Sequence, residues 1–265
     1  MNATAVLWGF VVVSFRQARA YIGAAALRLV QYPVKLVVMY YLWRAVLQSS
    51  TATLPQSLEL ITGYYAVALL IGHFYPFYRV ARQIEADIQN HTMDLNLCRP
   101  VPYWVRPLAP LILASFGYFV AALPVGMLVL ASLGVPLPHA ADLGAFALSL
   151  GIGIPMRFLL WLCLGLTAFW TESTQGAQSI FGWLEALASG ALVPLSLLPG
   201  GVARWLRFLP FQSYVSLPVE ASMGTISLQQ YAARLGVSIL WALVLAGLAA
   251  TLWRRGTRVY QSGGG

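Results

Sequence analysis

The chain has 265 residues, of which 59% are hydrophobic and only 9% are charged. Soluble domains are typically about 45–50% apolar and about 25% charged, so this composition excludes a soluble globular enzyme and indicates a surface that faces lipid. The net charge of +8 comes from 15 arginines and one lysine against 8 acids. Most of these arginines lie at the ends of apolar runs, which indicates membrane topology rather than a nucleic-acid-binding surface.

Apolar runs of about 20 residues predict six transmembrane helices. They are expected near residues 21–47, 58–78, 108–133, 143–169, 179–198 and 231–253. A shorter apolar stretch followed by Arg16 and Arg19 predicts an amphipathic interfacial helix over residues 1–19 rather than a signal peptide. The expected fold class is an all-α polytopic membrane protein with a single transmembrane domain over residues 1–265.

Residues 199–230 are rich in proline and glycine, too interrupted to span a bilayer and too apolar for a free loop. Irregular backbone at membrane depth survives only when it packs against protein. This segment therefore predicts short re-entrant helices on the outer side, between the fifth and sixth spans. The residues that mark the segment are Pro199, Trp205, Pro210, Phe211 and Pro218.

The distribution of arginines predicts the orientation of the spans. If the N-terminus is cytoplasmic, nine arginines fall on the cytoplasmic side. The other side then receives only Arg204 and Arg207 in loops, with Arg44 and Arg234 near span ends. By the positive-inside rule, both termini are expected in the cytoplasm.

No motif for nucleotide hydrolysis or metal catalysis is visible in the sequence. A phosphate-binding loop needs a lysine after a glycine, but the single lysine, Lys35, follows a valine. His73, His91 and His139 fall at three different membrane depths, so they predict no shared catalytic or metal site. The chain alone is therefore not expected to be an enzyme.

Three polar residues of the first span share one helical face. Arg28, Gln31 and Lys35 are separated by three and four positions. A cation at the bilayer centre costs about 2.5–3.5 kcal/mol, so the stripe should face protein or water. One interpretation is a translocation path for an anionic or amphipathic cargo, with Arg157 of the fourth span as a further candidate. The other is that Arg28 reaches the inner surface while Lys35 pairs with a partner subunit.

The most polar segment of the chain, residues 79–106, lies between the second and third spans. Val80, Ile84 and Ile88 repeat every four residues and predict an amphipathic helix. A helix lying on lipid is usually strongly basic, whereas this one is nearly neutral, which favours docking onto a soluble partner. The predicted docking residues are Arg82, Ile84, Glu85, Asp87, Ile88, Asp94 and Arg99.

The sequence IEADIQNHTMDLNLCRP, at Ile84–Pro100, resembles the coupling segment of ABC type 2 exporter permeases. The resemblance continues in order through AFWTES at Ala168–Ser173, SGALVPLSLLPG at Ser189–Gly200, LPFQSYVSLPVE at Leu209–Glu220 and the tail RRGTRVYQSGG. It covers essentially the whole chain. One departure is Asn-His-Thr at residues 90–92, where a glycine is common, so this helix end is expected to differ in shape.

This resemblance implies a permease subunit that pairs with a second permease, identical or related, and with two copies of an ATP-binding subunit. The coupling helix, expected over residues 82–95, would carry the partner's motion to the spans. The cargo implied is lipid-like or amphipathic, and the implied location is the inner membrane of a bacterium. The chain itself is expected to bind no cofactor, since ATP and Mg²⁺ would be held by the partner subunit, and no nucleic acid is expected.

Other functional classes remain open on sequence alone. An ion-gradient-driven secondary transporter or channel would need carboxylates buried within spans, and Glu185 is the one candidate. A membrane-embedded enzyme of lipid metabolism would need an interfacial catalytic cluster, which is not visible. A structural scaffold would leave the coupling-like segment unexplained.

Overall fold

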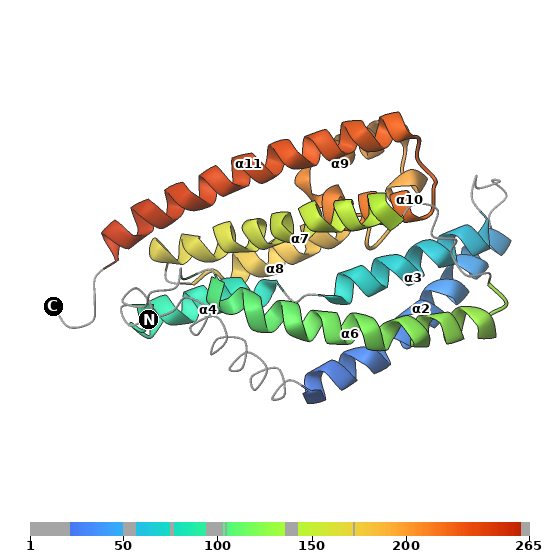
Figure 1. Ribbon diagram of the computed structural model, residues 1–265, viewed down its shortest axis with the longest axis horizontal. Coiled ribbons are helices and arrows are strands. Elements are labelled where there is room, and N and C mark those ends of the chain that lie inside the picture. Colours follow the sequence, from blue (N-terminus) through green and yellow to red (C-terminus); the bar gives the residue numbers. More distant parts are fainter. Residues whose placement is uncertain are drawn as a thin grey trace. The chain divides into compact units, whose positions relative to one another are not determined.

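A computed structural model describes residues 22–49, 57–74, 77–93, 103, 105–135, 143–171 and 173–260. Over these ranges the regular structure is helical (Figure 1). Contacts divide the chain into a first unit, residues 1–75 and 99–138, and a second unit, residues 76–98 and 139–265. The interfacial helix predicted over residues 1–19 lies outside the described residues.

The described part of the first unit contains three helices, each of which packs against the other two: α2 (Ile22–Ser49), α3 (Leu58–Phe74) and α6 (Val105–Ser132). Tyr32, Leu70, Tyr118 and Ala122 form its buried core. The Tyr32 hydroxyl donates a hydrogen bond of 3.0 Å to the carbonyl oxygen of Ala66, so this polar group is not left unsatisfied among apolar side chains. The three helices lie where the first three apolar runs predicted helices; that they span a membrane stays a prediction.

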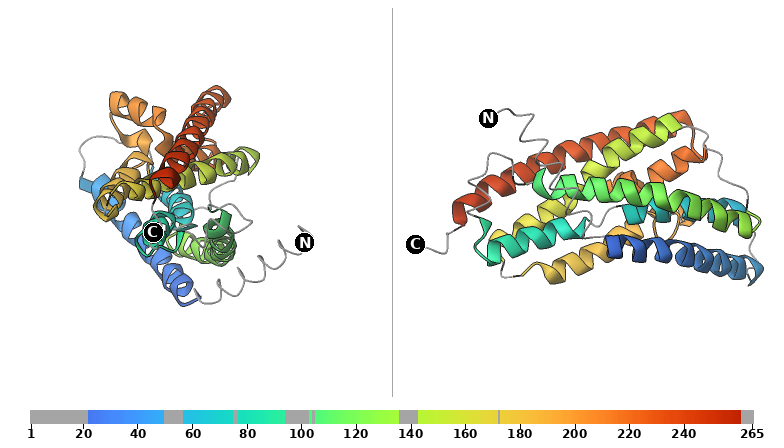
Figure 2. Two further views of the ribbon diagram at one scale, coloured as in Figure 1. Left: turned by 90° about the vertical axis from the view of Figure 1, so that its left-hand side faces the viewer. Right: turned by 60° about the horizontal axis from the view of Figure 1, so that its bottom comes forward.

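In the second unit, α7 (Leu143–Leu166) makes contacts with most of the other elements. It continues into the short 3-10 helix η1 (Thr167–Phe169), and α11 (Leu228–Val259) lies side by side with it (Figures 1 and 2). The helix α4 (Tyr78–Gln89) also packs on α7. A Cβ atom at Gly165 would lie 2.7 Å from the Cα of Ala81, so the close approach of α4 requires glycine there.

Short helices follow α8 (Gln175–Ala188). The first, η2 (Leu195–Leu197), falls within the predicted fifth span. The others lie within residues 199–230, where the sequence predicted short helices: α9 (Gly200–Phe208), η3 (Pro210–Tyr214) and α10 (Ser216–Ser222). Pro210, Phe211 and Pro218 are buried, whereas Pro199 and Trp205 are exposed. Because η3 and α10 pack against α7, the irregular backbone is held by protein.

The helices at the positions of the fifth and sixth predicted spans, α8 and α11, differ from those spans in length. The fifth, α8, has 14 residues and is therefore about 21 Å long, shorter than the hydrocarbon core of about 30 Å. It ends before Gly190, which has a φ of +86°, instead of continuing to residue 198. The sixth, α11, has 32 residues and starts at a capping box formed by Ser227 and Gln230.

Length and hydropathy qualify two of the described helices to cross a bilayer, over residues 143–169 and 228–259. Two shorter helices, over residues 58–72 and 117–132, are also apolar. The helical, apolar character of the fold is as predicted. The count of six spans stays a prediction.

Candidate functional site

The helix α4 is amphipathic, as its sequence predicted, but its bounds differ from residues 82–95. It begins at Tyr78 and ends at Gln89. Val80, Ala81 and Ile84 are at most 1% exposed. Ile84 lies one helical turn after Val80 and Ala81, so the three residues share the face of α4 that packs on α7. Its exposed residues include Arg82, Gln83 and Gln89.

The end of α4 has the geometry of a Schellman motif. The amide of Thr92 donates to the carbonyl of Asp87 at 3.0 Å, and the amide of His91 donates to that of Ile88 at 3.2 Å. His91 has a φ of +54°, the left-handed conformation that glycine usually supplies at this position. The departure at residues 90–92 therefore places a histidine in a glycine-type helix end.

The carboxylate of Glu85 points into the protein. The residue is 8% exposed and accepts hydrogen bonds from the Ser173 hydroxyl at 2.9 Å and the Thr174 amide at 2.8 Å. It also accepts from the Thr174 hydroxyl at 2.9 Å and the Gln178 side-chain amide at 3.0 Å. These four residues, which we term the Glu85 cluster, join α4 to the start of α8.

The environment of Glu85 keeps its carboxyl group ionised. Burial raises its pKa, but the hydrogen bonds from Thr174, Ser173 and Gln178 to the charged form lower it, and the net result is a pKa below its ordinary value of 4.5. The negative charge also lies at the N-terminal end of α8, where the helix dipole favours it. The charge is thus held by neutral donors.

Asp87, the second carboxylate predicted to dock a partner, is also buried, with 9% exposure. Its Oδ1 accepts hydrogen bonds of 3.0 Å from the side chains of Gln83 and Thr92, which stabilise the end of α4. Ile84 is buried and Ile88 half-buried. Asp94 and Arg99 lie outside the described residues. Docking of a partner on this helix stays a prediction, and the polar surface available for it is that of Arg82 and its exposed neighbours.

Arg157, a candidate for the translocation path, contacts protein on several sides. Its guanidinium pairs with Glu185 of α8, whose other oxygen accepts a 3.1 Å hydrogen bond from the Trp161 indole. The guanidinium carbon lies 5.4 Å and 5.3 Å from the ring centroids of Phe77 and Tyr214. This half-buried cation is stabilised by its carboxylate and by the two rings.

The remaining path candidates lie on α2 in the first unit. Gln31 and Lys35 are exposed and lie one turn apart, consistent with a shared face. The side chain of Arg28 lies outside the described part of the structure. Their role in a cargo path stays a prediction.

A second buried polar cluster joins α10 and η3 to α11. Arg234 of α11 donates to Gln212 at 2.7 Å, to Glu220 at 2.5 Å and to Ser216 at 2.8 Å. The Ser216 hydroxyl in turn donates to Glu220 at 3.0 Å. These residues, which we term the Arg234 cluster, are each at most 8% exposed and hold the short helices against α11.

Sequence reasoning missed the partners of Glu85. Ser173, Thr174 and Gln178 fall in a polar break that reads as an ordinary loop. The one available signal is the spacing of Thr174 and Gln178, which places two polar side chains on one face at a helix start. Among the residues that the structure describes, no group of three or more metal-ligating side chains gathers.

Long apolar helices with two ion pairs turned inward, Arg157–Glu185 and Arg234–Glu220, are typical of a membrane protein. The family model described as "ABC-2 family transporter protein" matches residues 34–264, and the chain belongs to this family. It is thus a multi-pass membrane protein and the permease subunit of an ABC transporter. Permeases of this family typically pair with ATP-binding subunits. No curated protein matches the chain.

Proposed function

We propose that this permease is the transmembrane part of an ATP-driven exporter of lipid-like or amphipathic substrates. It works with a second permease subunit, identical or related, and with two ATP-binding subunits that hold ATP and Mg²⁺. In this proposal it lies in the inner membrane of a bacterium with both termini in the cytoplasm. The lack of a phosphate-binding lysine and the bias of arginines to one side support the proposal.

The Glu85 cluster is the observation that carries this proposal. On its buried side, α4 is attached to α7 by the close contact at Gly165 and to α8 by the hydrogen bonds of Glu85. On its exposed side it presents Arg82 and Gln83. A partner that binds this exposed side in one nucleotide state would displace α4 together with the adjoining ends of α7 and α8.

Polar contacts continue from α8 towards the short helices. Glu185 lies ten residues after the start of α8 and binds Arg157 of α7. The Arg157 guanidinium lies against Tyr214 of η3. This series of contacts gives a physical route by which a shift of α8 changes the packing of the outer segment. Work against a gradient then requires that the partner bind the two conformations with different affinity.

The exposed face of α4 is tested by reversing its charge. Arg82→Glu should weaken co-purification of the full-length permease with its ATP-binding partner and abolish the stimulation of ATPase activity in reconstituted vesicles. Arg204→Glu is the matched control, because Arg204 is an exposed arginine on α9, away from α4 in the chain. If Arg82→Glu retains the same stimulation as Arg204→Glu, the partner does not dock on this face.

The structure offers less support for transport driven by an ion gradient. Such a mechanism needs a buried carboxylate that gains and loses a proton. Of the described buried carboxylates, Glu185 and Glu220 are each paired with an arginine. Glu85 and Asp87 accept hydrogen bonds from neutral side chains, and the pKa of Glu85 lies below its ordinary value. Uptake into vesicles that have a proton gradient but no ATP-binding partner would nevertheless establish that alternative.

A further inference from the structure

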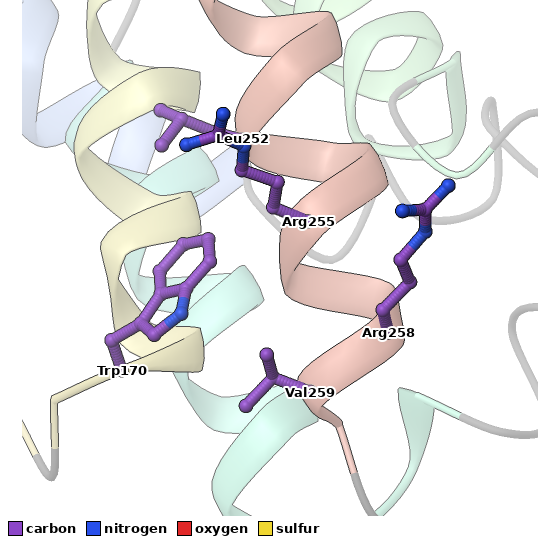
Figure 3. A pocket seen from close by; sticks show the side chains of 5 residues that line it. All are labelled: Trp170, Leu252, Arg255, Arg258 and Val259. Atoms are coloured by element: carbon purple, nitrogen blue, oxygen red, sulfur yellow. The ribbon is translucent and has the colours of Figure 1, made fainter.

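A cavity of about 500 Å³ lies beside the C-terminal end of α11. It is lined by Trp170, Leu252, Arg255, Arg258 and Val259 (Figure 3). Leu252, Arg255 and Val259 follow a spacing of three and four residues, so they share one face of α11. Trp170 faces them from the residue after η1. The cavity thus combines apolar side chains, an indole ring and two cations.

The packing of η1 on α11 fixes one wall of this cavity. A Cβ atom at Gly256 would overlap the ring of Phe169, so α11 and η1 are in direct contact there. The Phe169 ring also makes edge contacts with Trp253 and Tyr260, at centroid distances of 6.2 Å and 6.1 Å. Trp170 follows Phe169 in the chain, and its ring makes an edge contact with the Phe169 ring at a centroid distance of 6.0 Å. The indole therefore lies beside α11 with 46% of the residue's surface exposed.

The charge of the cavity is uncompensated in the described part of the chain. The ion pairs found there are Arg157–Glu185 and Arg234–Glu220, so neither Arg255 nor Arg258 has a carboxylate partner among these residues. Both are exposed, and no acid is among the lining residues. Two guanidinium groups beside an open cavity favour an anion, and above all a phosphate.

The position of the cavity along α11 indicates the source of that phosphate. A helix of 32 residues is about 48 Å long, whereas the hydrocarbon core is about 30 Å thick. The apolar part of α11 ends at Trp253 and is followed by Arg254 and Arg255, so this end emerges at the level of the lipid headgroups. Tryptophan is enriched at that level, which suits Trp170. Leu252 lies about one helical turn before Arg255, on the side of the apolar part of α11.

We propose that this cavity is a binding site for one anionic phospholipid of the adjacent leaflet. Arg255, whose guanidinium lies beside Leu252, binds the phosphate, and Arg258, on the other side of α11, adds to the positive charge that attracts the headgroup. Trp170 contacts the headgroup, and Leu252 contacts the start of an acyl chain. The site depends on α11 being a membrane helix and is independent of whether the permease is an ATP-driven exporter.

The site is tested by native mass spectrometry of the delipidated full-length chain, titrated with phosphatidylglycerol or with phosphatidylcholine. Arg255→Gln and Arg258→Gln should each weaken phosphatidylglycerol binding about fivefold, since a basic residue near the membrane surface contributes about one kcal/mol. Phosphatidylcholine has the same phosphate but a headgroup without net charge, so the two arginine variants should weaken its binding less than that of phosphatidylglycerol. Arg254→Gln is the control matched in charge, because Arg254 is exposed but does not line the cavity, and it should bind phosphatidylglycerol like the wild type.

A further variant and a competitor separate lipid binding in this cavity from a general attraction between surface arginines and anions. Trp170→Ala should also weaken phosphatidylglycerol binding, and an excess of inorganic phosphate should not displace the lipid. Equal weakening by Arg254→Gln would show a diffuse effect of surface charge and overturn the proposal. Displacement by phosphate, or unchanged binding in Trp170→Ala, would overturn it as well, because the contacts of Leu252 and Trp170 with the lipid would then contribute nothing.

Discussion

Two buried glutamates in the second unit are stabilised in different ways. Glu85, on α4, is 8% exposed and is held by two hydroxyls, a backbone amide and a side-chain amide. Glu220, on α10, is 5% exposed and is held by the guanidinium of Arg234 and the hydroxyl of Ser216. The Glu85 cluster thus has neutral donors, whereas the Arg234 cluster has a buried ion pair.

This difference predicts different costs for separating the two clusters. The donors around Glu85 can bond to water when α4 moves away, so separation costs little more than the hydrogen bonds themselves. Separation of a buried ion pair leaves a charge without a partner in a medium of low dielectric constant. The contact between α4 and α8 is therefore the one suited to change during a transport cycle, while α10 and α11 move together.

The largest expected effect is the loss of Arg234. Arg234→Leu leaves Glu220 buried without its cation and should lower the free energy of unfolding by about 3–5 kcal/mol. Thermal unfolding of the detergent-solubilised protein, followed by tryptophan fluorescence, measures this change. The double variant Arg234→Met with Glu220→Met should recover most of the loss, because it removes both charges. A loss no larger than that of a Glu85 variant would contradict the comparison.

A smaller effect is expected at Glu85. Glu85→Ala removes the acceptor of the Ser173, Thr174 and Gln178 donors and should cost about 2 kcal/mol. Glu85→Gln should cost less, since the amide oxygen still accepts hydrogen bonds. Gln175→Ala, at an exposed position at the start of α8, is the control and should change stability little. The same unfolding assay compares the three variants.

Acid provides a second measure of the Glu85 cluster. Because its pKa is lowered in the folded protein, the carboxyl group stabilises the fold above its ordinary pKa of 4.5, and this contribution is lost as the pH falls through the folded value. The stability difference between the wild type and Glu85→Gln should therefore shrink on acidification below pH 4.5. A difference that grows instead would show that Glu85 is not held as a carboxylate.

The smallest effect is expected at the end of α4. His91 has a left-handed conformation, which costs a residue with a Cβ atom about 1–2 kcal/mol, partly offset in glycine by its greater freedom when unfolded. His91→Gly should thus raise the free energy of unfolding by up to about 1 kcal/mol. Asn90→Gly is the control, because Asn90 has a φ of −88°, and it should bring no gain. Equal stabilisation by both variants would contradict a role for the conformation of His91.

Local sequence patterns predicted the helices better than their ends. The four-residue repeat of Val80, Ile84 and Ile88 identified α4, but its end depends on hydrogen bonds from Thr92 and on a histidine in a glycine-type conformation. The apolar run over residues 179–198 predicted a full span, but the conformation of Gly190 ends α8 at Ala188. A hydropathy value averaged over a window of residues does not detect the single residues that end a helix.

Composition and periodicity by themselves determined that this is a helical membrane protein, that a polar amphipathic helix separates its second and third apolar segments, and that short helices precede the last one. Which carboxylates face inward was decided only by the tertiary structure, because Glu85 meets Thr174 across 89 residues of sequence and Glu185 meets Arg157 across 28. Hydrophobic repeats report which face of a helix is buried. They carry no information on which polar group of a distant helix will lie opposite, and that pairing is set by how the helices pack.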